Sequence, residues 1–146
     1  MYSVWLSAEQ QELWRGYLTM VGRLDAEMNR QLQRDCGLSL ADYDVLVQLS
    51  EHGSMRVFEL ASALSWEQSR LSHHLRRMRE RGLVARRGSS QDRRGASVFL
   101  TSRGRAALAA AAPGHAELVR ALVFDGMTVG ELRALRSLTS RVLSRL

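Results

Sequence analysis

The chain of 146 residues contains no lysine, one cysteine and one proline. Cys36 has no second thiol with which to form an intrachain disulfide, and no neighbouring cysteine completes a zinc-binding motif. No run approaches the roughly 18 consecutive apolar residues of a membrane span, and the first residues lack the basic and apolar regions of a signal peptide. These absences predict a cytoplasmic protein with no membrane segment, no disulfide and no bound metal or cofactor.

The residue patterns typical of catalysis are also missing. We find no nucleophile beside a positioned base, no paired carboxylates and no glycine-rich phosphate loop at a recognisable spacing. Apolar residues make up 45% of the chain, which is enough for one domain with a hydrophobic core. We therefore expect a single folded unit over residues 1–146 that is not an enzyme.

Positive charge is concentrated in the middle of the sequence. All 21 basic residues are arginine, and the net charge of the chain is +6. Residues 55–105 hold twelve arginines and four acidic residues, a net charge of +8, whereas the rest of the chain carries −2. A basic middle part suits a polyanionic partner, because neutralised phosphates release condensed counterions. A solvated arginine-rich surface explains the charge alone equally well.

Helical periodicity is clearest at the two ends. Apolar residues recur every three or four positions from Ala8 to about Arg34 and again from about Val129 to Arg145. Further helices are predicted at about 40–51 and 57–64. Another begins at Thr101 or Ser102 and is kinked or interrupted at Pro113-Gly114.

Ser65 opens the strongest local pattern. Residues 65–68 fit a capping box and precede a helix that ends at Gly82, with Leu71, Leu75 and Met78 on one stripe. The opposite face and its flanks carry hydrogen-bond donors suited to DNA, and the predicted contacts are Ser69, Arg70, Ser72, His73, Arg76 and Arg77.

Two short strands, 83–87 and 96–100, enclose a polar turn bounded by glycine and predict a β-hairpin. Arginines at its tip suit the narrow minor groove, whose negative potential attracts guanidinium groups. The residues predicted to act in this hairpin are Arg86, Arg87, Asp92, Arg93 and Arg94.

The order helix, short helix, turn, basic helix and hairpin is that of a winged helix-turn-helix. We therefore predict a mainly α fold with a small β-wing, in which residues 38–101 bind the major groove of double-stranded DNA. Residues 8–35 and 102–146 are predicted dimerisation helices, because a small central unit cannot cover their apolar stripes. A homodimer would place two recognition helices in successive grooves, roughly 34 Å apart.

Several short motifs resemble the MarR family of regulators. They are Glu-Leu-Ala at 59–61, the segment 79–84 ending Gly-Leu-Val, and Asp-Arg-Arg at 92–94 followed by Leu100-Thr101 and Gly104. Residues 69–73 and 112–115 are similar to a subgroup common in high-GC actinobacteria, although His73 stands where many members carry arginine or another residue. The resemblance implies an obligate homodimer that binds a palindromic operator and represses its own or a neighbouring operon. It also implies that Asp92 and Arg94 brace the wing.

An aromatic cluster has two interpretations. Trp14, Tyr17, Tyr43 and Leu46 would line a pocket for a small aromatic effector, which the resemblance places in this region, but core packing accounts for the same residues.

Further alternatives remain open. Cys36 would act as a redox sensor in a single-cysteine regulator, or it is an ordinary residue at a helix end. The four histidines lack paired metal-ligand spacing and are expected at the surface or on DNA. An architectural or nonspecific DNA-binding protein without ligand response would share the basic patch.

Overall fold

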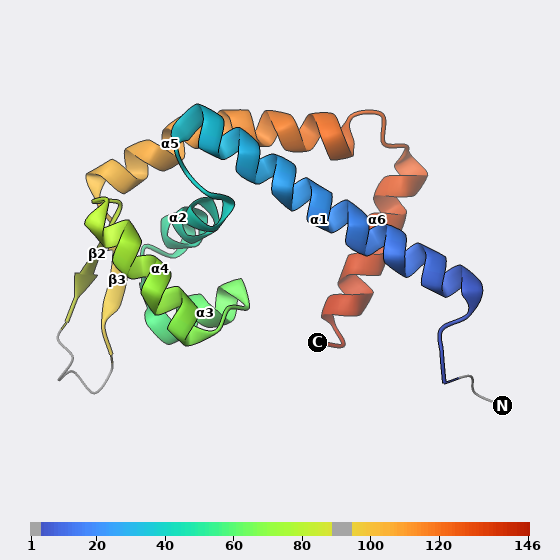
Figure 1. Ribbon diagram of the computed structural model, residues 1–146, viewed down its shortest axis with the longest axis horizontal. Coiled ribbons are helices and arrows are strands. Elements are labelled where there is room, and N and C mark those ends of the chain that lie inside the picture. The colour runs from blue at the N-terminus through green and yellow to red at the C-terminus, as the bar shows by residue number, and fades with distance from the viewer. Residues whose placement is uncertain (1–3, 89–94) are drawn as a thin grey trace. The chain divides into compact units, whose positions relative to one another are not determined.

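The computed structural model describes residues 4–88 and 95–146 and has two compact units, Met1–His115 and Ala116–Leu146. Helices and a small antiparallel sheet make up the first unit (Figure 1). This mixture confirms the predicted mainly α fold with a β-wing. In chain order the elements are α1 (Ala8–Cys36), α2 (Leu40–His52), β1 (Ser54–Arg56), α3 (Val57–Leu64), α4 (Gln68–Glu80), β2 (Val84–Arg87), β3 (Ser97–Leu100), α5 (Ser102–Val119), the π-helical turn η1 (Arg120–Phe124) and α6 (Val129–Leu143).

The corner between α1 and α2 is defined by its capping residues. Gly37 ends α1 with a φ of 65°, the left-handed conformation that glycine adopts without cost. Ser39 then caps α2 through a reciprocal pair of hydrogen bonds with Asp42, each 2.9 Å long. The chain therefore changes direction within three residues, which holds the start of α2 close to the end of α1.

The sheet has three strands in the order β1-β3-β2, all antiparallel. The sequence predicted β2 and β3, but not β1, whose three residues follow Gly53 directly. Met55 pairs with Val98, and Val84 pairs with Leu100. These four side chains are buried, so the sheet turns one apolar face to the helices.

The turn between α3 and α4 corrects one prediction. Ser65 does not cap α4; it ends α3 with a φ of 57° in the left-handed region. Glu67 is the residue that precedes α4, and its side chain makes no capping hydrogen bond. The capping-box pattern thus marked the right boundary but the wrong residue, because Ser65 is used to close the preceding helix.

One hydrophobic core joins the helices to the sheet in the first unit. Each large side chain that is fully buried contributes roughly 1.5–3 kcal/mol. The largest of them are Leu32, Val45, Leu46, Leu49, Leu60, Leu71, Met78 and Val98. Leu71, Leu75 and Met78 are the inward face of α4, as its periodicity predicted. The opposite face of α4 is therefore turned to solvent.

Gly104 allows α5 to start directly against the hairpin. A Cβ atom at this position would lie 2.0 Å from the backbone oxygen of Leu83. The Thr101 hydroxyl accepts a hydrogen bond from the Gly104 amide and lies 2.6 Å from the carbonyl oxygen of Gly82. Thr101, one of the two predicted capping residues, thus caps α5. It also connects the start of α5 to the segment that follows α4.

The sequence predicted a kink or an interruption at Pro113-Gly114, and the interruption is wrong, because Pro113 lies inside α5. The helix continues to Val119, and the irregularity appears seven residues later in the turn Arg120–Phe124. Among the described residues, one stretch, Ser102–Phe124, is long and apolar enough to cross a membrane by length and composition.

Helix α6 begins at a capping box formed by Thr128 and Glu131, and all of its residues are exposed. Its apolar stripe is nevertheless the one that the sequence predicted. The exposed apolar side chains of α6 are Val129, Leu132, Leu135, Leu138, Val142 and Leu143. A second stripe on α1 is exposed in the same way, at Leu13, Trp14, Tyr17, Leu18 and Met20.

Candidate nucleic-acid interface

The outer face of α4 carries the six polar residues singled out in the sequence. All six are exposed: Ser69, Arg70, Ser72, His73, Arg76 and Arg77. Arg76 lies 3.5 Å from Glu80 one turn later, a weak pair because both side chains are mostly in solvent. The structure thus presents these donors together, and their contact with DNA stays a prediction.

Asp42 anchors α4 to the helix beneath it. Its carboxylate lies 2.9 Å from Nε2 of His74 and accepts a 2.7 Å hydrogen bond from Arg81 at the end of α4. Arg81 also donates to the carbonyl oxygen of Gly37 at 2.8 Å. One buried carboxylate therefore connects the α1–α2 corner to the middle and the end of α4.

This environment keeps Asp42 ionised. Burial by itself would raise its pKa, but the His74 ring, the Ser39 backbone N–H and the Arg81 guanidinium outweigh burial and hold the pKa far below its ordinary value of 3.8. Asp42 is only 4% exposed, so these partners replace the water that the charge has lost. The sequence contained the Ser39–Asp42 capping pattern, but nothing in it linked Asp42 to residues 74 and 81.

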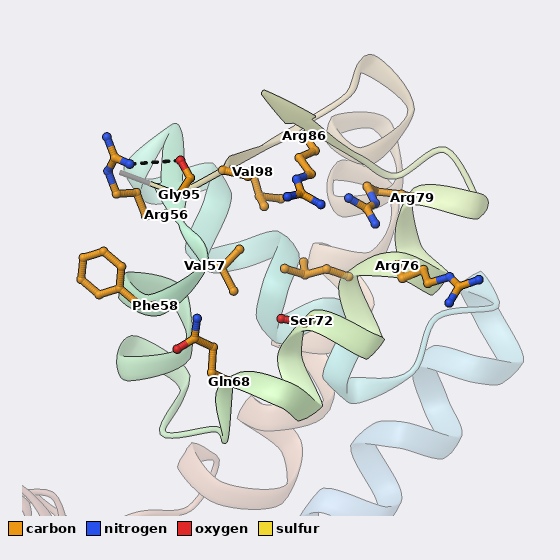
Figure 2. Close-up of a pocket in the computed structure, with 12 residues that line it drawn as sticks. Arg56, Val57, Phe58, Gln68, Ser72, Arg76, Arg79, Arg86, Gly95 and Val98 are labelled. Atoms are coloured by element: carbon orange, nitrogen blue, oxygen red, sulfur yellow. Dashed lines mark hydrogen bonds between the residues drawn. The ribbon is translucent and has the colours of Figure 1, made fainter. Parts of the chain in front are cut away.

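A hollow of about 330 Å³ lies beside the exposed face of α4. Figure 2 shows Arg76, Arg79 and Arg86 on one side of it and Arg56 on the other. Arg56 donates to the carbonyl oxygen of Gly95 at 3.1 Å, which connects the start of α3 to the end of the hairpin loop. Four guanidinium groups around one concavity give it a strong preference for anions.

Three polar residues that line this hollow were not predicted as site residues. Arg56 is the last residue of β1, the strand that the sequence did not predict, and Gln68 and Arg79 lie on the side of α4 that faces the hairpin. The 100° rotation per residue placed Arg79 between the inner and outer faces of α4 and gave no reason to choose it. Residues of the hairpin line the other side of the hollow, so this side of the helix is defined by a contact between distant parts of the chain.

The two predicted arginines of β2 have different surroundings. Arg86 lines the hollow, and the Arg87 guanidinium lies 4.8 Å from the centre of the Phe99 ring. Asp92, Arg93 and Arg94 lie outside the described residues, so the predicted brace of the wing stays a prediction.

The predicted aromatic cluster is divided between two environments. Trp14 and Tyr17 stack on each other, with ring centres 5.7 Å apart, and each is about half exposed. Tyr43 instead packs on His115 at 4.3 Å, and Leu46 is fully buried in the core. The effector pocket remains a prediction, since core packing explains Tyr43 and Leu46 while Trp14 and Tyr17 belong to an exposed stripe.

Two histidines expected at the surface lie inward instead. His74 is 12% exposed and faces Asp42, whereas burial against Tyr43 lowers the pKa of His115 below its ordinary value of 6.5. Periodicity placed His73 on the outer face of α4, where it is exposed, but gave no partner or inward position for His74. Cys36 is half-buried at the end of α1, in a groove with Arg81 and Arg103. In the part of the chain that the structure describes, no three His, Cys, Asp or Glu residues are grouped as metal ligands.

The side chains on this face are mainly hydrogen-bond donors. Arginine, serine and glutamine side chains surround the hollow and cover α4, and Glu80 is the acidic side chain paired among them. The major groove of B-DNA admits an α-helix, and α4 has 13 residues with one face exposed. The guanidinium groups at its sides are suited to the flanking phosphates.

Comparisons with known proteins agree with this geometry. The sequence model described as "MarR family" matches residues 38–95. The chain is similar to the crystal structure of Sco3205, a MarR family transcriptional regulator from Streptomyces coelicolor in complex with DNA. That likeness has 37% identity and a TM-score of 0.90, and covers 99% of this chain and 92% of the other. It is also similar to AbsC, a MarR family regulator from the same organism, with 33% identity, a TM-score of 0.88 and coverage of 98% and 97%.

A curated relative is YfiV of Bacillus subtilis, described as an uncharacterized HTH-type transcriptional regulator. It is 32% identical over 99 residues, which make up 66% of this chain. The aligned part spans 59% of the length of YfiV.

Proposed function

This chain belongs to the MarR family of transcriptional regulators, and from that premise we propose that it is a sequence-specific repressor acting on double-stranded DNA. The exposed arginine-bearing face of α4 enters the major groove of a palindromic operator. The arginines around the hollow bind the adjacent phosphates. The observation that carries the proposal is this face itself, with four arginines around one concavity beside a helix whose outer donors are all exposed.

The proposed repressor is a homodimer. The stripes on α1 and α6 expose large apolar side chains, among them Leu13 at 67% and Val129 at 66%. Apolar surface of this extent favours association, and a two-fold partner covers matching stripes on both copies. We assign residues 8–35 and 102–146 to this dimer contact and residues 38–101 to DNA.

The proposed location is the cytoplasm, where the operator is. In this proposal the apolar surface of Ser102–Phe124 belongs to the dimer contact, not to a membrane span. We further propose that a small aromatic molecule releases the repressor from its own or a neighbouring operon, in keeping with the family resemblance. Trp14 and Tyr17 are the candidates for contacting it, as a stacked and half-exposed pair.

Selection of bound sequences from a random duplex pool tests the DNA-binding function. We expect one enriched palindrome, bound at least about 10³-fold more tightly than scrambled DNA of the same length and salt. Equal affinity for both would reject a sequence-specific regulator in favour of an architectural DNA-binding protein.

The role of α4 is tested with Arg76→Ala on the selected palindrome. We expect a loss of about 1–3 kcal/mol in binding free energy if Arg76 reads a base, and a loss that is the same for all sequences if it contacts phosphate. Arg34→Ala is the matched control. This exposed arginine pairs with its neighbour Asp35 and is not part of the apolar stripe of α1, so its removal should leave the dimer intact and the affinity within about twofold of the wild type.

A further inference from the structure

The inner side of the recognition helix contains a contact network that begins at His74. Nδ1 of this ring lies 3.3 Å from a terminal nitrogen of Arg77, while Nε2 lies 2.9 Å from Asp42. A guanidinium can only donate hydrogen bonds, so Nδ1 is the acceptor in this contact. The other ring nitrogen faces the carboxylate of Asp42, which therefore helps to fix the ring that contacts Arg77.

The same histidine also supports a second arginine through an indole ring. Trp66, in the turn before α4, meets His74 edge-on with ring centres 5.6 Å apart and planes at 90°. The Arg70 guanidinium lies 4.3 Å from the centre of the Trp66 ring, within the range of a cation–π contact. Trp66 is half-buried, so its position is set by the protein and not by solvent. This contact holds the guanidinium at the ring through its charge, and the N–H donors that point away from the ring remain available for DNA.

We propose that Trp66 and His74 are positioning residues that hold Arg70 and Arg77 in place before DNA binds. Asp42 is the anchor of this network. The inference rests on the proposed function, because it concerns how two of the proposed DNA contacts are oriented. Without the network, each arginine would have to be immobilised when DNA binds, and the ordering cost would appear as weaker affinity.

A double-mutant cycle between Trp66 and Arg70 tests the first branch on the selected operator. We expect Trp66→Leu to lower operator affinity about 3- to 10-fold, the ordering cost of one long side chain. In an Arg70→Ala background the same change should have less than about a twofold effect, because the residue it positions is gone. Trp66→Phe keeps an aromatic face and should recover most of the loss.

The second readout is discrimination between bases. Trp66→Leu should reduce the preference for the operator over single-base variants at the same positions as Arg70→Ala does. A purely structural role of Trp66 would weaken binding to all sequences equally, in both backgrounds. Melting temperatures of the variants, followed by circular dichroism, separate lost folding from lost positioning.

His74→Phe tests the second branch, because it keeps a ring beside Trp66 and removes the acceptor for Arg77. Its effect on affinity should disappear in an Arg77→Ala background and persist in an Arg70→Ala background. If the wild type binds the operator, unchanged affinity in Trp66→Leu, or an equal loss with and without Arg70, overturns this inference alone. A wild type that binds no duplex DNA overturns the proposed function and this inference with it.

Discussion

A single carboxylate buried among polar partners has large effects on the stability of this fold. Asp42 accepts hydrogen bonds from Ser39 and Arg81 and lies at ion-pairing distance from His74. Replacing the carboxylate with an amide would remove the charge and one of the two acceptor oxygens in a site with little access to water, so Arg81 would donate to a weaker, neutral acceptor. The energetic cost would therefore exceed that of losing an exposed ion pair.

We expect Asp42→Asn to lower the free energy of unfolding by about 1.5–3 kcal/mol at neutral pH, the range for hydrogen bonds to a charged group. Chemical denaturation followed by circular dichroism measures this change. Glu51→Gln, at an exposed position on the same helix, is the control and should stay within about 0.5 kcal/mol of the wild type.

The pH dependence of stability gives an independent check on Asp42. Its pKa is lower in the folded protein than in the unfolded chain, so the unfolded chain binds the proton more tightly. The stabilisation from Asp42 is therefore fully present above its ordinary pKa of 3.8 and is lost as the pH falls towards the folded value. Asp42→Asn should flatten the acid limb of the stability curve, and an unchanged limb would contradict the assignment.

Among the elements, α4 combines a well-packed inner face with a weak start. The capping boxes of α1, α2 and α6 each satisfy two backbone donors, whereas Glu67 satisfies none with its side chain at the start of α4. Its negative charge is still favourable there, since the helix dipole is positive at this end. A residue that caps the first turn of α4 should therefore stabilise the protein.

Glu67→Asp should stabilise the protein by about 0.5–1 kcal/mol, because the shorter side chain can accept from the first turn of α4 while keeping the charge. Thermal unfolding measures the gain. Glu67→Ala, which removes the charge without adding a cap, should instead be neutral or slightly destabilising. A gain of the same size in both variants would contradict capping as the cause, because alanine has no side-chain acceptor and carries no charge.

Sequence periodicity predicted most of the helices and the exposed face of α4, because apolar stripes and caps are local features. It missed β1, since three residues are too few to show alternation and this strand forms only against β3. It also missed the inward position of His74 and the hollow around Arg56 and Arg79. Those depend on contacts between residues about 30 or more positions apart, which no local pattern contains.

At the scale of the whole molecule, the exposed apolar stripes are the feature that a single copy leaves unexplained. Leu135 and Leu138 of α6 are 37% and 45% exposed, although they repeat at the spacing of a buried helix face. Isolated exposed leucines are common in soluble proteins, but contiguous stripes mark interaction surfaces. The proposed homodimer accounts for both stripes.

We expect Leu138→Asp to shift the protein towards monomer, because a carboxylate in an apolar contact loses its hydration without gaining a partner. Sedimentation velocity measures the change, and operator affinity should fall at least about 10-fold as the second half-site contact is lost. Ser137→Asp, on the opposite side of α6, adds the same charge and should leave the assembly intact. Equal dissociation of both variants would place the contact elsewhere.

The arrangement around Asp42 has a mechanical consequence. Arg81 bonds both to this carboxylate and to the carbonyl oxygen of Gly37, so the last turn of α4 is coupled directly to the corner where α1 ends. If the corner between α1 and α2 tilts, the two hydrogen bonds of Arg81 require the end of α4 to move with it, because no flexible loop lies between them. Changes in the angle of α1 would thereby alter how α4 is aimed.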